Sequence, residues 1–171
     1  MILQDNIIKY INTKRTELLN NLPEYVLEIR QNAIRSFSHN GFPKSNDEKW
    51  RKTKLKDFFN QNFHPDIGLI VNREKYLNDY CLVPELETNN ISLVNGLFIG
   101  EYELKTFSNG VILGSLKAAL HQYPDLLKDY FGRLTRKHSN PLVDLNTSVF
   151  SDGMFLYVPK VFLLIYKSLK S

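Results

Sequence analysis

Apolar residues recur at three- and four-residue spacings over the first forty positions. Between residues 3 and 20 this pattern predicts one amphipathic helix that ends at Asn20-Asn21. A second apolar stripe follows Pro23, a residue suited to a first helical turn, and Asn40-Gly41 supplies a left-handed stop. Because the connection between the two helices is short, we expect them to pack as a hairpin.

The most basic stretch, residues 45–63, interleaves cationic and aromatic side chains. Ser45 and Glu48 have the spacing of a capping box, which predicts a helix start. One interpretation is a basic, aromatic surface, Lys49–Lys56 with Trp50, for an acidic partner or nucleic acid. The other, which we favour, is a solvated helix face with Trp50 and Phe58-Phe59 turned into the core.

The middle of the sequence predicts short strands joined by tight turns. Asn95-Gly96 is the preferred pair for a two-residue hairpin turn, and Asn109-Gly110 marks a second turn. Residues 66–83 give no clear pattern. The predicted strands cover residues 91–94, 97–99, 103–107 and 111–113.

Two helical segments follow these strands. Ser115 is a typical N-cap for the first, Pro124-Asp125 restarts the second, and Gly132 ends it. A basic linker, residues 133–138, then leads to Asn140-Pro141.

The stretch from Leu145 to Lys160 reads LNTSVFSDGMFLYVPK. Polar residues lead into Val149-Phe150, Asp152-Gly153 suits a tight turn, and apolar and β-branched types continue to Pro159. We therefore predict a strand, a turn and a second strand. Two short strands are marginal in water, so this apolar run needs further strands or a helix to cover it.

Composition fits one globular core in a protein of 171 residues, 43% hydrophobic and 23% charged. The net charge of +4 is a mild excess that does not by itself indicate a nucleic-acid-binding protein. The single cysteine, Cys81, excludes an intrachain disulfide and favours a reducing compartment. Neither a secretory signal nor a membrane-spanning run is visible, so we expect a cytoplasmic protein.

Residues that carry chemistry are scattered. The four histidines lie in separate segments and no CxxC pair exists, so a metal site has little support. No glycine-rich nucleotide loop is present, and Ser151-Asp152-Gly153 has no base nearby in sequence. We expect no catalytic, cofactor-binding or metal residues and a protein that is not an enzyme. The histidines, expected at the surface or at caps, are His39, His64, His121 and His138.

Two separated motifs resemble the SufB/SufD family, the scaffold subunits of the SUF iron–sulfur cluster assembly machinery, and its SufD type more than its SufB type. The first is Gly41-Phe42-Pro43 followed by Glu48, Trp50, Arg51 and Thr53, and the second is the stretch from Leu145 to Lys160. The resemblance implies structural roles for Gly41, Phe42, Pro43, Glu48, Trp50, Thr53, Leu145, Asn146, Thr147, Asp152, Gly153, Tyr157, Val158 and Pro159.

The resemblance also implies a fold and partners. The family core is a right-handed parallel β-helix, through which SufD pairs with SufB, and a C-terminal helical domain binds the SufC ATPase. The implied fold class is α+β: a helical N-terminal region, a small mixed α/β segment, and the first strands of a β-helix that is not completed. The implied partners are SufB-like and SufC-like subunits, with contacts impaired in this protein. Positions matching the family's implicated cysteine and histidine are missing, so we expect no cofactor here, although the full complex assembles iron–sulfur clusters.

The expected division is a helical region over 1–63, a mixed segment over 64–137, a β-helix start over 138–160 and a non-family tail over 161–171. After Lys160 the sequence departs from the family pattern. We hypothesise that a one-base slip shifted the reading frame there, which would leave a truncated product. A natural short paralogue and an engineered fragment are the alternatives.

The leading function is therefore a truncated SufD-like scaffold that acts by protein–protein interaction. The alternative is a basic helical adaptor that binds nucleic acid through Lys49–Lys56 and Trp50, which steep weakening by salt would reveal. An enzyme of unrecognised type ranks last, because no acid, base and nucleophile converge in the sequence.

Overall fold

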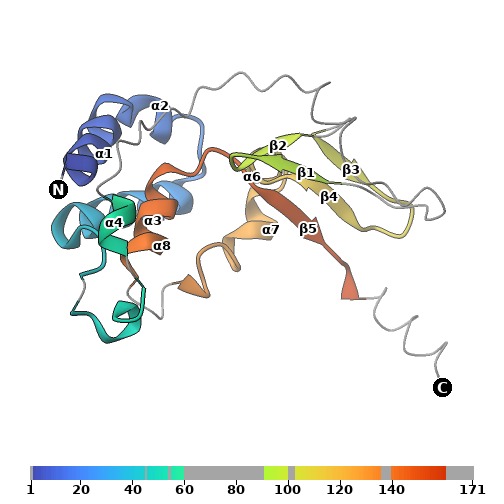
Figure 1. Cartoon of the computed structure of the whole chain (residues 1–171). Coiled ribbons are helices and arrows are strands. Elements are labelled where there is room, and N and C mark those ends of the chain that lie inside the picture. Colours follow the sequence, from blue (N-terminus) through green and yellow to red (C-terminus); the bar gives the residue numbers. More distant parts are fainter. Residues whose placement is uncertain are drawn as a thin grey trace. The chain divides into compact units, whose positions relative to one another are not determined.

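The computed structural model describes residues 2–44, 46–53, 55–59, 91–99, 103–135 and 140–160. The protein divides into two compact units. The first comprises Met1–Leu69 with Pro124–Phe150, and the second comprises Ile70–Tyr123 with Ser151–Ser171. Each unit is thus built from two separate stretches of sequence, whose elements are labelled in Figure 1.

The described part of the first unit is helical. The predicted helix over residues 3–20 is confirmed, with an interruption at Lys14. The second predicted helix is also confirmed, and Gly41 follows it with a left-handed φ of +67°. The helices are α1 (Ile2–Thr13), α2 (Arg15–Leu19), α3 (Glu24–Asn40), the 3₁₀ helix η1 (Glu48–Trp50), α4 (Leu55–Phe59), α7 (Pro124–Lys128) and α8 (Pro141–Val149).

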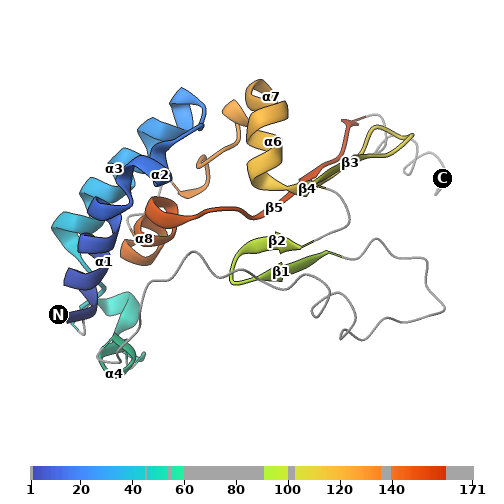
Figure 2. The ribbon, with the colours of Figure 1, turned by 90° about the horizontal axis from the view of Figure 1, so that it is seen from above.

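Aromatic rings form the centre of the first unit's core. Phe42 meets Phe37 of α3 edge-on, with ring centres 5.3 Å apart, and stacks on Phe59 of α4 at 3.8 Å. Leu3 of α1 joins them, and all four side chains are buried. Because Gly41 ends α3 and redirects the backbone, the next residue, Phe42, turns back against the helix. The GFP motif therefore closes the core to which α1, α3 and α8 contribute. These three helices are labelled in Figure 2.

The strand predicted over residues 146–150 is wrong, because these residues lie in helix α8 and its C-cap. Asn140 caps this helix, its side-chain oxygen accepting a hydrogen bond from the Leu142 N–H at 3.0 Å, and Pro141 occupies the first turn. Leu142 and Leu145 pack against the aromatic cluster, and Val149 packs against a second cluster around Ile34. Tertiary burial of this apolar face outweighs the strand preference of the local sequence.

The second unit contains two antiparallel arrangements of strands. The predicted hairpin is confirmed as β1 (Ser92–Val94) and β2 (Leu97–Ile99), with Val94 opposite Leu97. Asn95 and Gly96 take positive φ of 51° and 81°, as this turn requires. The other predicted strands are confirmed as β3 (Leu104–Thr106) and β4 (Ile112–Ser115), which pair around the second turn. Helix α6 (Leu116–Gln122) follows at once, with Ser115 as its N-cap, as predicted.

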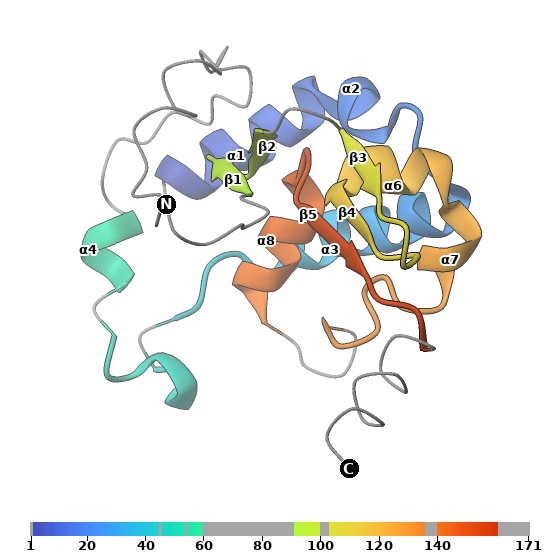
Figure 3. The same ribbon diagram turned by 90° about the vertical axis from the view of Figure 1, so that its right-hand side faces the viewer.

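The predicted final strand is confirmed as β5 (Met154–Tyr157), but its partner is β4 and not residues 146–150. The sheet order is β3-β4-β5, and every pairing in it is antiparallel. Strand β5 lies at one edge of this sheet (Figure 3). Within the described ranges no parallel pairing occurs, so the expected β-helix is not confirmed.

Several predictions concern residues outside the described ranges. These are the capping residue Ser45, the pattern-poor segment 66–83, Cys81, His64, His138 and the tail 161–171. His39 and His121 are described, and both are exposed, as predicted. No helix in the described ranges is long and apolar enough to span a bilayer.

Candidate functional site

The first motif serves the core more than the surface. Gly41, Phe42 and Pro43 are buried, Trp50 of η1 is half-buried, and Glu48 and Thr53 are exposed. The Trp50 N–H donates to the Asp47 carbonyl at 2.9 Å, and the Thr53 N–H donates to the Trp50 carbonyl at 2.9 Å. These backbone bonds hold η1 in place after the GFP turn.

The basic stretch is less basic on the described surface than the sequence run implies. Lys49, Arg51 and Lys52 are exposed, but acidic Asp47 and Glu48 lie directly before them. Trp50 is half-buried, so its ring is not fully available for stacking on a base. These features do not favour the nucleic-acid alternative.

Arg30 is a buried cation in the first unit. It lies on α3 with 3% of its surface exposed. Its guanidinium donates to the backbone carbonyls of Leu18, in the last turn of α2, and of Phe150, the C-cap of α8. Its central carbon lies 4.0 Å from the centre of the Phe150 ring, a cation–π contact.

Burial lowers the pKa of Arg30 to about 10. Nε is buried and has no hydrogen-bond partner. The compensation for the buried charge therefore comes from two helix C-termini and one aromatic face. The signal for this arrangement in the sequence is a charged residue inside the apolar stripe of the second helix, a feature that the predictions above left without a role.

A groove of about 340 Å³ runs between α3 and α8 within the first unit. Two acidic side chains, Glu28 and Asp144, line it, and the Ser36 hydroxyl donates to Asp144 Oδ2 at 2.6 Å. Thr147, a motif residue, also lines it. The only base in contact with the Ser36 hydroxyl among the described residues is the Asp144 carboxylate, and no histidine or lysine is among the described lining residues.

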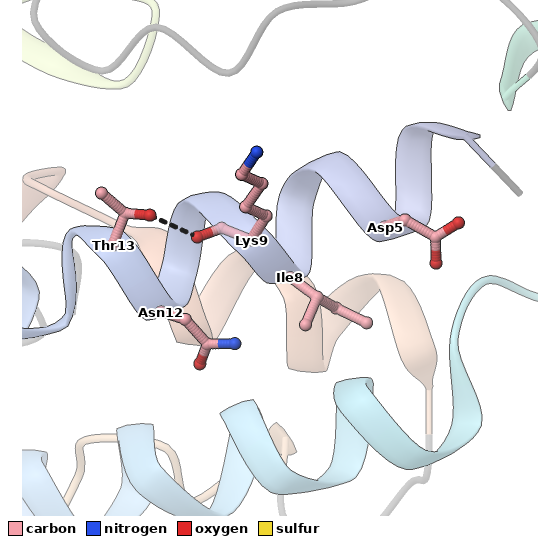
Figure 4. Close-up of a pocket in the computed structure, with 5 residues that line it drawn as sticks. All are labelled: Asp5, Ile8, Lys9, Asn12 and Thr13. Carbon is pink, nitrogen blue, oxygen red and sulfur yellow. Dashed lines mark hydrogen bonds between the residues drawn. The ribbon is translucent and has the colours of Figure 1, made fainter.

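A wider hollow of about 560 Å³ lies along α1 (Figure 4). Its described lining residues all come from this one helix, where the Thr13 hydroxyl donates to the Lys9 carbonyl at 2.8 Å. In Figure 4 the Ile8 and Asn12 side chains point away from the side that Lys9 occupies. These residues therefore do not converge on a common point, and the hollow is a weak candidate for a ligand site.

Asp152 connects three parts of the second unit. Its Oδ1 accepts hydrogen bonds from Ser115 Oγ at 2.8 Å, from the Lys117 N–H at 3.0 Å and from the Gly153 N–H at 2.8 Å. Its Oδ2 accepts a longer bond from the Phe98 N–H of β2. The carboxylate thus ties the beginning of β5 to the start of α6 and to the hairpin. The tight turn predicted at Asp152-Gly153 is wrong, because residues 151–153 form no turn and Gly153 does not take a positive φ. The Asp152 side chain does accept a bond from the adjacent Gly153 N–H, and its longer-range bonds could not be predicted from the sequence.

The outer face of β5 is the candidate interaction site. Met154, Leu156 and Val158 alternate along the strand and are 50%, 53% and 39% exposed. Phe155 and Tyr157 point to the other face and are half-buried. Among the described residues, no strand pairs with the free edge of β5. An apolar edge strand of this kind is a surface that proteins normally cover.

The remaining motif residues lie on α8 and around β5. Leu145 is half-buried, and Asn146 is exposed. Gly153 lies close to Leu116, whose Cδ2 would be 3.4 Å from a β-carbon at that position, so a small residue fits there. Pro159 lies next to Gly110. The structural roles expected for these motif residues stay predictions.

No group of three or more potential metal ligands comes together among the described residues. The features that remain are the buried Arg30 contacts, the Asp152 connections and the exposed face of β5.

Comparison with protein families identifies the protein's relatives. The sequence model of the SufBD protein N-terminal region matches residues 1–165. The chain belongs to the SufBD family. The match does not separate the SufB type from the SufD type, so the SufD type stays a prediction.

Several SufBD family proteins are similar over most of the sequence, and their names describe iron–sulfur cluster assembly. A chloroplastic member from Arabidopsis thaliana is 28% identical over 92% of this chain and 30% of its own length. A member from Porphyra purpurea is 29% identical over 90% of this chain and 33% of its own length. One from Mycobacterium bovis is 27% identical over 92% of this chain and 19% of its own length.

The 171 residues therefore span a third or less of the length of these SufBD relatives. No solved structure matches the sequence.

Proposed function

We propose that this protein supplies the N-terminal region of a SufD-like scaffold subunit in iron–sulfur cluster assembly, and that it acts by protein–protein interaction and not by catalysis. The observation that carries the proposal is the match of the SufBD N-terminal region to residues 1–165. The names of the relatives support iron–sulfur cluster assembly as the process in which it takes part. The exposed face of β5 supplies a surface through which such a unit can act.

In this proposal β5 opens the β-helix core of the scaffold. Its free edge, among the described residues, offers unpaired backbone groups, and its exposed face offers Met154, Leu156 and Val158. A strand added at this edge would satisfy the backbone groups and cover the apolar side chains. The α8 helix and the Asp152 connections would then be the supports that fix where the core begins.

The proposed partners are SufB-like and SufC-like subunits. The family resemblance assigns SufB contact to the β-helix and SufC contact to a C-terminal helical domain. The matched residues 1–165 correspond to the N-terminal region of the family, and in this proposal only their last strand, β5, belongs to the core that contacts the SufB-like subunit. We therefore expect the isolated 171-residue protein to retain neither the ATPase nor iron–sulfur clusters.

A pull-down tests this assignment. The bait is either the isolated protein or a hybrid in which residues 1–160 replace the N-terminal region of a full-length SufD relative. The hybrid is expected to recover the SufB-like and SufC-like subunits, while the isolated protein does not recover the ATPase. Recovery of the ATPase by the isolated protein, or failure of a folded hybrid to recover either subunit, would contradict the proposal.

A matched pair of substitutions locates the surface. Leu156→Asp places a charge on the exposed face of β5, and Leu93→Asp places one on the similarly exposed strand β1. We expect Leu156→Asp to lower the yield of soluble, folded hybrid, because the continuing core would bury the introduced charge. Leu93→Asp should leave this yield unchanged, because the core would not cover that position. If the two substitutions lowered the yield equally, the proposed role of β5 as the surface covered by the core would be wrong.

A further inference from the structure

The sequence has three Asn-Gly pairs, Asn40-Gly41, Asn95-Gly96 and Asn109-Gly110. In such a pair the glycine backbone nitrogen, after losing its proton, can attack the asparagine Cγ. A bond from that nitrogen to Cγ forms, the bond between Cγ and Nδ2 breaks, and ammonia leaves a cyclic succinimide. Water from the solvent then opens either ring carbonyl, giving aspartate or isoaspartate. The net reaction consumes one water and releases one ammonia, with no oxidant or reductant.

The attacking nitrogen is engaged in two of the three pairs. The Gly41 N–H donates to the Phe37 carbonyl at 2.8 Å, at the end of the long helix α3. The Gly110 N–H donates to the Phe107 carbonyl at 2.9 Å. Asn109 Oδ1 additionally accepts from the Val111 N–H at 3.2 Å, which fixes the side chain that would react. Both reactions require these hydrogen bonds to open first.

The third pair lacks this protection. Asn95 and Gly96 are both exposed, and no acceptor among the described residues takes the Gly96 N–H. A β-carbon built on Gly96 would meet nothing within 4 Å, so space for ring closure exists. The flanking strands β1 and β2 have three residues each. A two-stranded pair of this length opens easily, which lets Asn95 leave its left-handed conformation.

We propose that Asn95 is a site of spontaneous deamidation in the native protein, preferred over Asn40 and Asn109. Isoaspartate would add a backbone carbon to the turn that sets Val94 opposite Leu97. The product would therefore loosen the hairpin and the Phe98–Asp152 bond that ties it to the start of β5. The modification would leave the helical core of the first unit intact.

The test compares the native protein with the protein unfolded in guanidinium, in the same mildly alkaline buffer. Proteolysis and mass spectrometry give the deamidation rate at each asparagine. The rate in the unfolded protein is the rate that the local sequence produces without folded structure. The deamidation rate of Asn95 in the native protein is expected to stay close to its rate in the unfolded protein. Asn40 and Asn109 are expected to slow at least about tenfold, as an opening free energy of about 1.4 kcal/mol would produce.

A variant provides the second readout. Asn95→Gln requires a larger ring for the same attack, so ammonia release from the native protein should fall to the residual contribution of the other sites. Equal protection of all three asparagines in the native protein would overturn the proposal. Faster native deamidation at Asn40 or Asn109 than at Asn95 would overturn it as well.

Discussion

The guanidinium of Arg30 lies over the ring of Phe150, 4.0 Å from its centre, and donates a hydrogen bond to the backbone carbonyl of the same residue. A second hydrogen bond reaches the Leu18 carbonyl. Because the last carbonyls of a helix have no partner within the helix, this one guanidinium completes the C-terminal ends of both α2 and α8. Phe150 is also the last residue of the first unit before the backbone enters the second.

Replacing Arg30 tests this connection. Arg30→Met removes both donors and leaves two backbone carbonyls without them, so we expect the free energy of unfolding to fall by about 2–4 kcal/mol. Arg35→Met on the same helix is the control, because Arg35 is exposed and donates to Asn32 on the surface. This control should change stability by less than about 0.5 kcal/mol. Chemical denaturation measures both, and equal stabilities of the two variants would contradict the structural role of Arg30.

Tyr25 provides a pH-dependent contact within the first unit. Its hydroxyl donates to the Pro124 carbonyl at 3.0 Å, and burial, with a smaller effect of Asp125, raises the pKa of the Tyr25 phenol above its ordinary value of 10.0. The neutral phenol therefore stabilises the fold fully below pH 10, and this contribution is lost as pH rises through the folded-state pKa. Tyr25→Phe should cost about 1 kcal/mol at neutral pH.

Denaturation of wild type and Tyr25→Phe across neutral and alkaline pH checks this expectation. The stability difference between them should shrink above pH 10, because the ionised phenol can no longer donate to Pro124. A difference that stays constant, or that grows with pH, would show that the hydroxyl does not stabilise the fold in its neutral form.

Replacing Asp152 tests the connections that its carboxylate makes in the second unit. Asp152→Ala removes the acceptor for Ser115, Lys117 and Gly153, so we expect a loss of about 2–3 kcal/mol. Asp152→Asn keeps one side-chain oxygen and should lose roughly half of that. Thermal unfolding followed by circular dichroism measures the series. Asp152→Asn behaving no better than Asp152→Ala would show that charge, and not accepted hydrogen bonds, is what the site needs.

Gly114 shows where the sheet cannot accept a side chain. Its φ is +154°, and a β-carbon there would lie 2.1 Å from the Glu103 backbone oxygen on the neighbouring segment. Gly96 also has a positive φ but open space around it. Gly114→Ala should therefore cost at least about 2 kcal/mol more than Gly96→Ala. If denaturant titrations gave similar losses of unfolding free energy for the two variants, the positive φ, and not the close approach of Glu103, would account for the cost of Gly114→Ala.

Local signals in the sequence predicted much of the second unit. Asn95-Gly96, Asn109-Gly110 and the Ser115 cap each specify a backbone geometry through a few adjacent residues, and the structure has each of them. The partner of β5 could not be predicted in this way. The pairing of Leu113 with Leu156 joins residues far apart in sequence, and no local pattern encodes it.

The first unit shows how a local interpretation fails. The polar run before Val149-Phe150 resembles a strand, but Asn140 and Pro141 begin a helix whose apolar face fits α3. Those two residues are a helix start signal that the strand prediction overlooked. Arg30 could be recognised as unusual in an apolar stripe, whereas the carbonyls that accept its hydrogen bonds come from elsewhere in the sequence. The division into four segments and the β-helix start at residues 138–160 stay predictions.

Cluster assembly by the hybrid subunit tests whether residues 1–160 act as the N-terminal region of a SufBD scaffold. The hybrid carrying residues 1–160 would be co-expressed with SufB-like and SufC-like partners and purified without oxygen, and its bound iron and sulfide would be compared with those of the parent relative and of that relative without its N-terminal region. The hybrid is expected to hold iron–sulfur clusters at a level close to that of the parent relative. A folded hybrid complex that holds no more iron and sulfide than the N-terminally deleted relative would contradict it.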